Sequence, residues 1–371
     1  MIVVSAIALV IWIYLLFFRG HFWRLRVLEP QTAAAARVVA VIPARNESQN
    51  VGRAVSSLLR QELVDLTIVL IDDGSTDGTA EVATRATATA QLTVVPGSPL
   101  PPGWTGKLWA VEQGIQRALE QDPDFILLTD ADIEHDPQVV ASLVQHARDG
   151  FDLVSYMVKL RCESMPERLL IPAFVYFFFQ LYPPAWIARA RMKTAGAAGG
   201  CMLISPEALR RAGGIAAIRG EIIDDCALAR AVKGSGGRVW LGPTDASRSL
   251  RSYGTFAEIG RMIARTAFNQ LRHSTLLLLL TIAGLLLTYI APIASVVSGQ
   301  RLAMILGGTA WAFMTASYVP TVRFYRLNPL WSLTLPLAAL FYAGATVWSA
   351  VQYWSGRGGQ WKGRHQDVVI E

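Results

Sequence analysis

Two aspartates, Asp130 and Asp132, follow closely on an apolar run from Phe125 to Leu128. A run without alternation is typical of a buried parallel strand, and open α/β sheets bind ligands where such strands end. Side chains two residues apart on an extended chain point to the same side, so both carboxylates are expected in one space. Carboxylate oxygens suit Mg²⁺ or Mn²⁺, with substrate phosphates and water completing the shell. The pair predicts a metal site; a helix cap in a solvated turn is the alternative.

A second acidic pair, Asp224 and Asp225, precedes an apolar helical pattern that includes Leu228 and Val232. Helix N-termini favour carboxylates for structural reasons alone. Adjacent carboxylates can also raise one another's pKa, and a general base needs only to reach the proton that it removes. The pair therefore has a structural interpretation as a cap and first-turn acid, and a chemical one in which one member is a base.

Strands and helices alternate through the first half of the chain at the spacing of a parallel, doubly wound sheet. Strands are expected over 37–42, 67–71, 92–95, 125–128 and 152–158. Helices are expected over 48–61 and 107–119, after Asp77, after Asp136 and from Asp224. The expected fold class is α/β, with a mostly parallel sheet that carries the first acidic pair at a strand end.

Long stretches without charge indicate a membrane protein. Of the 371 residues, 52% are hydrophobic and 17% are charged, whereas soluble domains carry roughly 25% charged residues. We expect a transmembrane anchor at 1–18 and a C-terminal transmembrane region of three helices at 276–354, since each apolar stretch is long enough to cross a bilayer. A cytoplasmic domain at 37–265 lies between them, and 355–371 form a tail.

Basic residues beside the apolar stretches indicate orientation. Arg19, Arg24 and Arg26 follow the first stretch, which predicts an inner-membrane protein whose catalytic domain faces the cytoplasm. Residues 169–188 are apolar but contain three prolines, so we interpret them as an interfacial amphipathic segment, with an extra span as the alternative. The net charge of +6 is concentrated beside spans, and no nucleic-acid-binding motif is present. The side of the tail and the oligomeric state stay open.

An ordered set of motifs connects these features. The chain contains VAVIPARNE, VLIDDGSTDGT, LLTDAD, GGCMLI and DDCAL, in that order. The set resembles the membrane-bound family 2 glycosyltransferases, which have a GT-A fold, and the resemblance covers about 38–265. Within that family it points to the hopene-associated glycosyltransferases, which are related to ceramide glucosyltransferases, through the segment GWTGKLWA and the layout of the spans.

The resemblance implies a role for each matching position. The nucleotide-sugar donor would contact the ends of the first two strands and a lysine that begins a helix. The positions implied for the donor are Pro43, Ala44, Arg45, Glu47, Asp72, Asp73, Lys107 and Asp130. Asp132, together with Asp130, would hold the metal that bridges the diphosphate. Asp225 would be the base that deprotonates the acceptor hydroxyl, and Asp224 replaces the glutamate of the family pattern.

One departure from the family pattern concerns processive members, which carry Gln-x-x-Arg-Trp near the membrane. The corresponding residues here are Met262 to Thr266, and only the arginine, Arg265, is kept. Its guanidinium suits a diphosphate, or it marks the cytoplasmic side of a span. Loss of the tryptophan favours transfer of one sugar. The expected function is inverting transfer from a nucleotide-diphosphate sugar to a membrane lipid hydroxyl, with Mg²⁺ or Mn²⁺, in hopanoid or related glycolipid synthesis.

Three other functions are weighed against this one. A processive polysaccharide synthase shares most of the motifs. A lipid-linked nucleotidyltransferase usually carries a Gly-rich loop after its first strand, where this chain has PARNES. A non-catalytic membrane scaffold would not need the acids that the chemistry requires, all of which are present.

Overall fold

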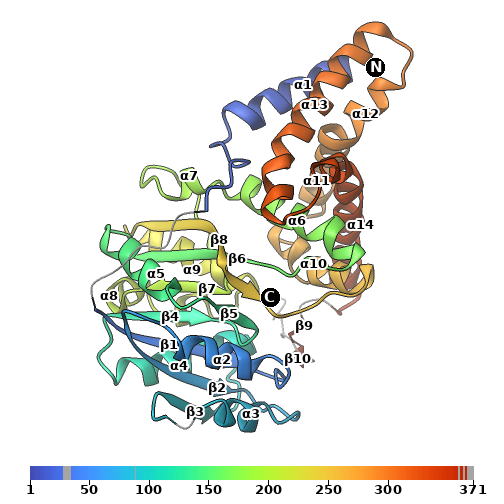
Figure 1. Ribbon diagram of the computed structural model, residues 1–371. Coiled ribbons are helices and arrows are strands. Elements are labelled where there is room, and N and C mark those ends of the chain that lie inside the picture. The colour runs from blue at the N-terminus through green and yellow to red at the C-terminus, as the bar shows by residue number, and fades with distance from the viewer. Residues whose placement is uncertain (28–34, 88, 358–359, 362–363, 366–371) are drawn as a thin grey trace. The chain divides into compact units, whose positions relative to one another are not determined.

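The computed structural model describes residues 1–27, 35–87, 89–357, 360–361 and 364–365 (Figure 1). Much of the predicted tail at 355–371 therefore lies outside the described residues. The chain divides into two compact units, which are treated separately here. The helical unit comprises Met1–Leu25, Cys162–Ala185 and Ser252–Gly358. The sheet unit comprises Arg26–Arg161, Trp186–Arg251 and Gly359–Glu371.

Eight strands of the sheet unit form one sheet in the order β3-β2-β1-β4-β7-β6-β8-β5 (Figure 1). They are β1 (Arg37–Ala44), β2 (Asp65–Asp72), β3 (Leu92–Pro96), β4 (Phe125–Thr129), β5 (Ile133–His135), β6 (Leu153–Lys159), β7 (Cys201–Ile204) and β8 (Val239–Ser249). Neighbours from β3 to β4 are parallel, as are β6 and β8, whereas β7 is antiparallel to β4 and β6, and β5 to β8. The expected α/β class with a mostly parallel sheet is confirmed.

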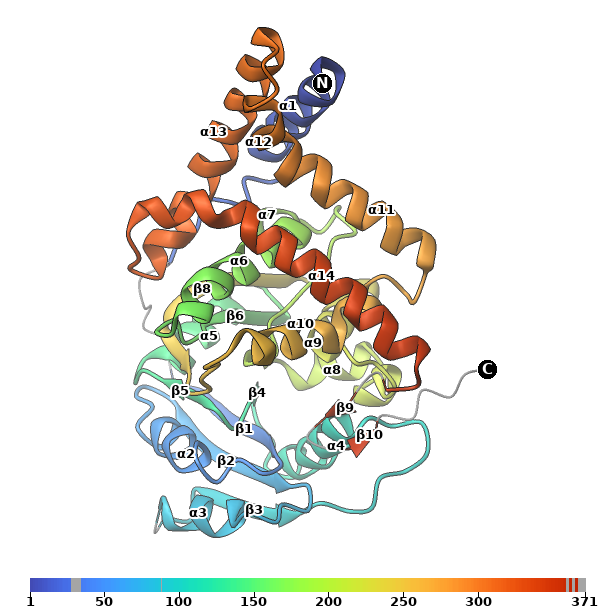
Figure 2. The ribbon, with the colours of Figure 1, turned by 90° about the vertical axis from the view of Figure 1, so that its right-hand side faces the viewer.

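The central strands are continuously apolar because both of their faces are covered. On β1, Val38 and Ile42 belong to the core shared with helices α2 (Val51–Leu59) and α5 (Val139–Arg148). Val41 faces the opposite way and packs against α4 (Gly106–Leu119). Figure 2 shows α2 and α4 on opposite sides of β1 and β2.

The remaining helices of the sheet unit are short or lie near the edge of the sheet where β4 ends. They are α3 (Thr79–Arg85), α8 (Pro206–Arg211), the 3-10 helix Ile215–Ile218 and α9 (Asp224–Gly234), with α7 (Pro184–Ile187) at the boundary of the two units. The five predicted strands are present, with ends shifted by up to two residues. The sequence did not predict β5, β7 or β8. The antiparallel β7 matters most, because it brings the preceding glycines beside the end of β4.

The helical unit contains the apolar segments. It comprises α1 (Ile2–Phe17), α6 (Met165–Leu181), α10 (Phe256–Gln270), α11 (Thr275–Leu285), the π-helical turn Leu286–Ile290, α12 (Ala291–Val296), α13 (Arg301–Phe324), the 3-10 helix Pro329–Thr334 and α14 (Leu335–Trp354). Trp12 of α1 donates its indole N–H to the carbonyl of Thr288 at 2.8 Å, and Ser5 bonds Ser295 at 2.8 Å. These buried hydrogen bonds fix the N-terminal helix within the unit.

Four helices of the described chain are long and apolar enough to cross a membrane, by length and composition: Met165–Ile187, Thr275–Val296, Arg301–Phe324 and Pro329–Trp354. Three of them coincide with the region predicted at 276–354, and the shorter α1 coincides with the predicted anchor at 1–18. The first contains most of the segment 169–188, for which an interfacial position stays a prediction.

Candidate active site

The end of β4 sets the position of the first acidic pair. Thr129, its last residue, pairs with Cys201 of β7. Asp130 to Asp132 then form a turn that leads directly into β5, and the carbonyl of Asp132 accepts a hydrogen bond from the N–H of Leu250 at 2.8 Å. The extended geometry expected for this pair is therefore wrong, because the chain turns before Asp132. The carboxylate of Asp132 still lies close enough to help raise the pKa of Asp130.

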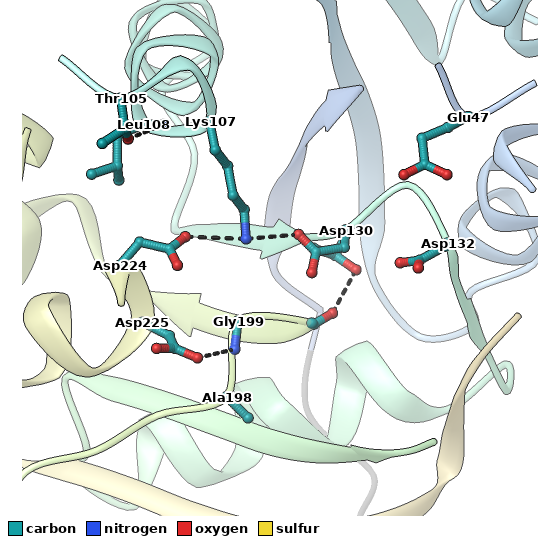
Figure 3. Close-up of polar contacts among 12 residues, drawn as sticks. Glu47, Thr105, Lys107, Leu108, Asp130, Asp132, Ala198, Gly199, Asp224 and Asp225 are labelled. Carbon is teal, nitrogen blue, oxygen red and sulfur yellow. Dashed lines mark hydrogen bonds and ion pairs between the residues drawn. The ribbon is translucent and has the colours of Figure 1, made fainter. Parts of the chain in front are cut away.

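Lys107 connects the two acidic pairs (Figure 3). It lies in the first turn of α4, where the hydroxyl of Thr105 caps the helix by accepting from the N–H of Leu108. Its ammonium nitrogen lies 3.0 Å from Asp130 Oδ1 and 3.1 Å from Asp224 Oδ2. Burial alone would lower the pKa of Lys107, but the two carboxylates outweigh it and raise that pKa. The lysine is therefore a permanent cation between the end of β4 and the start of α9.

Asp225 is held in a defined orientation. Its Oδ2 accepts from the N–H of Gly199 at 2.9 Å, and its Oδ1 accepts from the N–H of Cys226 at 2.6 Å. Burial and the neighbouring carboxylate of Asp224 raise the pKa of Asp225 to about 6, against the opposing effect of these N–H groups and of Lys107. A carboxylate with a pKa close to neutrality, held by backbone donors, is suited to remove a proton.

One pocket of the sheet unit adjoins Asp225, which accepts the hydrogen bond from Gly199 in the pocket wall. Its polar lining comes from Lys107, Asp130 and Asp224, together with Gly199 and the end of β1 at Pro43. Its apolar lining comes from Leu108, Val111, Leu128, Met202, Ile215, Ile218 and Leu228. A concave site with few charged groups on apolar walls is the usual form of a small-molecule site.

Glu47 and Asp132 lie on the Asp130 side of Lys107 (Figure 3). Their side chains are only 10% and 11% exposed, and Arg251 bridges them, with contacts of 2.7 Å to Glu47 and 2.8 Å to Asp132. Among the described residues, no group of three histidine, cysteine or acidic side chains could hold a metal alone. Burial and the carboxylates of Asp132 and Asp224 raise the pKa of Asp130 despite Lys107. This excess of acidic oxygens fits a hard divalent cation that shares its shell with substrate phosphates.

The other predicted donor residues form the loops around this edge. Ala44 is the last residue of β1 and pairs with Asp72. Arg45 donates to the carbonyl of Asp73 and lies 3.6 Å from its carboxylate, while Asp72 Oδ1 accepts from the N–H of Ser75 at 3.1 Å. Arg265 is an exposed residue of α10 in the helical unit, and its role in donor binding stays a prediction.

Sequence reasoning missed a buried chain of hydrogen bonds beneath the site. Thr129 Oγ1 donates to the carbonyl of Gly200 at 2.8 Å, so it must accept the hydrogen of His135 Nε2 at 3.0 Å. His135 Nδ1 is then left to accept from Ser247 at 2.9 Å. Desolvation lowers the pKa of His135 to about 4, which keeps it neutral. These hydrogen bonds link Thr129, which precedes Asp130, to Gly200, which follows Gly199. The only indication of them in the sequence was His135, shortly after the acidic pair.

This neutral histidine predicts a pH dependence of stability. The unfolded chain binds a proton at His135 below its ordinary pKa near 6.5, whereas the folded chain does not until about pH 4. Stability is therefore lost as the pH falls through this window, by about 2 kcal/mol between pH 7 and pH 5. We expect His135→Gln, which keeps hydrogen-bonding groups but does not titrate, to show a smaller fall in thermal midpoint over that range. Equal falls in both proteins would contradict the assignment.

Comparison with known proteins bears on this arrangement. Residues 39–212 match the model of Glycosyl transferase family 2. An undecaprenyl-phosphate 4-deoxy-4-formamido-L-arabinose transferase of Pectobacterium carotovorum subsp. carotovorum (strain PC1) is 30% identical over 135 residues, 36% of this chain and 40% of that protein. A 4,4'-diaponeurosporenoate glycosyltransferase of Staphylococcus aureus (strain USA300) is 34% identical over 119 residues, 32% of this chain and 29% of that protein. The chain thus covers less than half of these relatives.

The fold has a counterpart that extends over nearly the whole chain. The solved structure of the mannosyltransferase PcManGT from Pyrobaculum calidifontis, in complex with GDP-Man and Mn²⁺, matches with a TM-score of 0.55 and 19% identity. The match covers 94% of this chain and 99% of that chain. This likeness shows a GT-A-like fold, and the sequence match covers both β4 with its acidic turn and the glycines before β7. The comparisons thus show similarity to Glycosyl transferase family 2 over residues 39–212 and a GT-A-like fold.

Proposed function

We propose that the chain transfers one sugar from a nucleotide-diphosphate sugar to a hydroxyl group of a membrane lipid, with inversion at the anomeric carbon. The observation that carries this proposal is Asp225, a carboxylate with a raised pKa that two backbone N–H groups hold beside the pocket. A hydroxyl must lose its proton as it attacks, and a positioned base accelerates that step. In the proposed reaction the hydroxyl oxygen attacks the anomeric carbon directly, and no covalent bond forms between the sugar and the protein. A single displacement of this kind inverts the anomeric carbon.

The lipid acceptor is supported by two kinds of observation. The described chain carries four helices of membrane-spanning length, and the names of two relatives contain a polyprenyl phosphate or a carotenoid acid. A hopanoid or related glycolipid is the finer proposal, and it rests on the sequence resemblance through GWTGKLWA. We also propose that the sheet unit faces the cytoplasm, since Arg19, Arg24 and Arg26 follow the first apolar helix.

An undecaprenyl phosphate acceptor is the second candidate, favoured by the arabinose transferase relative. A phosphate oxygen is already ionised near neutral pH, so its attack requires no base. Under that function Asp225 would serve only to order the start of α9. The need for Asp225 therefore separates the two candidates.

The donor would bind at the carboxyl ends of β1, β2 and β4, the usual ligand edge of an open α/β sheet. Asp132 and Asp130 would hold Mg²⁺ or Mn²⁺, which neutralises charge on the departing diphosphate. Lys107, between Asp130 and Asp224, adds a fixed positive charge beside the same space. Its ion pairs also keep the donor end of the site and the base at a set separation, which favours an in-line attack.

The direct test is to incubate the purified full chain and a membrane lipid extract with a panel of nucleotide sugars and Mn²⁺. Mass spectrometry would then identify any glycolipid and its linkage. A product with one sugar on a lipid hydroxyl is the expected result. A sugar phosphodiester would favour the phosphate acceptor, a growing polymer would favour a processive synthase, and sugar released only into water would contradict lipid transfer.

A further inference from the structure

Arg251 lies two residues after the end of β8 and joins two carboxylates that are far apart in the sequence. Its Nε lies 2.8 Å from Asp132 Oδ2, and its Nη2 lies 2.7 Å from Glu47 Oε1. Glu47 is 204 residues away along the chain and Asp132 is 119 residues away. Because β8 ends beside the acidic turn, the N–H of Leu250 also bonds the carbonyl of Asp132. The guanidinium is thus built into the edge of the sheet where the donor is proposed to bind.

The two carboxylates need a counter-cation. Their side chains are almost fully buried, while that of Arg251 is 36% exposed. Removing a carboxylate from water is costly unless a positive charge lies nearby. The planar fork of a guanidinium can satisfy two carboxylates at once, which the shorter, compact ammonium of lysine cannot do in the same geometry.

The same carboxylate oxygen cannot serve two cations equally well. A divalent ion bound to Asp132 would sit about 2.1 Å from a carboxylate oxygen, and Arg251 already lies within hydrogen-bond distance of that group. A divalent ion and a guanidinium at such short range repel each other even at a high effective dielectric constant. Occupation of Asp132 by metal therefore opposes the ion pair between Asp132 and Arg251.

We propose that Arg251 is an internal cation that occupies the position between Asp132 and Glu47 and competes with the divalent metal. The inference rests on the proposed function only in taking Asp132 as a metal ligand. Arg251 keeps the two buried carboxylates neutralised and ordered when metal is absent, and it lowers the apparent metal affinity, because a bound ion would be repelled by its positive charge. It is a positioning residue for the metal site.

The test measures binding of Mn²⁺ alone to the full chain in detergent, by titration calorimetry or by the electron paramagnetic resonance signal of free Mn²⁺. No nucleotide or sugar is added. Arg251→Gln keeps polar contacts but removes the competing charge, so Mn²⁺ should bind roughly tenfold more tightly or better. Arg251→Lys keeps a charge that cannot bridge both carboxylates, so an intermediate gain of about threefold is expected.

Arg248→Gln is the matched control. Arg248 lies on β8, three residues before Arg251, and its ion pair is with Asp136 at 3.6 Å. The substitution removes the same charge without touching Glu47 or Asp132, so the Mn²⁺ affinity should change less than threefold. If Arg248→Gln strengthens binding as much as Arg251→Gln, a general change in electrostatic field explains the result and the proposal is overturned.

Other outcomes are equally decisive. Unchanged or weaker Mn²⁺ binding in both Arg251 variants would overturn the proposal, as would an absence of binding in every protein. If Arg251→Gln does not fold, judged by its thermal midpoint, the lysine variant alone decides, since it too must bind Mn²⁺ more tightly than the unmodified chain. Because no transfer is measured, a chain that transfers no sugar would defeat the proposed function without touching this result.

Discussion

Replacing Asp225 by asparagine is expected to lower the rate of sugar transfer by roughly 10³-fold, within the range found for loss of a general base. The amide is nearly isosteric, and one of its ends can still accept the hydrogen bond from Gly199. Donor binding should therefore stay within about threefold. Single-turnover transfer and nucleotide binding, measured separately on the same protein, would show loss of the chemical step with binding retained.

The pH dependence gives the same prediction a second readout. A base must be deprotonated to act, and burial together with Asp224 raises the pKa of Asp225 to about 6. The transfer rate should thus rise with pH, reach half of its plateau near pH 6 and level off above that. In the Asp225→Asn variant the residual rate should not rise with pH in this way, because the titrating carboxyl group is gone.

Asp224→Asn is the control for Asp225. It lies one residue earlier in the same first turn of α9, and its partner is Lys107 at 3.1 Å. Its loss removes one of the two ion pairs of Lys107 but leaves the base, so we expect a decrease of about tenfold. The rise of the rate with pH should be retained but shifted to lower pH, because Asp224 raises the pKa of Asp225. Full turnover by Asp225→Asn would show that the acceptor is already ionised, which is the phosphate alternative.

The sequence indicated much of the fold for a simple physical reason. Strands β1, β2 and β4 are buried on both faces, so their positions appear as apolar runs such as Phe125 to Leu128 that end in Asp, Gly or Pro. β8 carries no such signal, because it includes Gly242 and Pro243 within its eleven residues. β7 is the four-residue apolar run CMLI, which periodicity alone cannot distinguish from part of a buried helix. Their pairing depends on partners distant in the sequence, which periodicity cannot identify.

The candidate site was likewise predicted only in part from the sequence. Lys107, Asp130 and Asp224 were each singled out as residues with a chemical role, and the structure brings them together. Their mutual contacts were not predicted, because the first of these ion pairs joins the start of α4 to the end of β4 across the sheet edge. Arg251 was missed entirely. An arginine after a polar strand is ordinary in sequence, and only the fold places it against Glu47 and Asp132.

Asp132→Asn should be nearly as damaging as the change at Asp225, for a different reason. Lys107 engages Asp130 at 3.0 Å and Arg251 engages Asp132 at 2.8 Å, but burial and the surrounding carboxylates raise the pKa of Asp130 and so weaken it as an anionic ligand. We therefore expect Asp132 to be the main metal ligand. A neutral amide oxygen binds Mg²⁺ or Mn²⁺ more weakly than a carboxylate does. We expect transfer at saturating donor to fall roughly 10²-fold or more, with a much higher Mn²⁺ concentration needed for half-maximal rate.

Asp136→Asn is the matched control for this prediction. Asp136 follows Asp132 by four residues, is exposed, and pairs with Arg248 at 3.6 Å. Its substitution changes the same charge near the same turn and should leave Mn²⁺ activation within about twofold. An Asp132→Asn protein whose Mn²⁺ requirement matches that of the unmodified chain would remove Asp132 from the metal site. The proposed competition with Arg251 would then fail as well, because both depend on the same carboxylate.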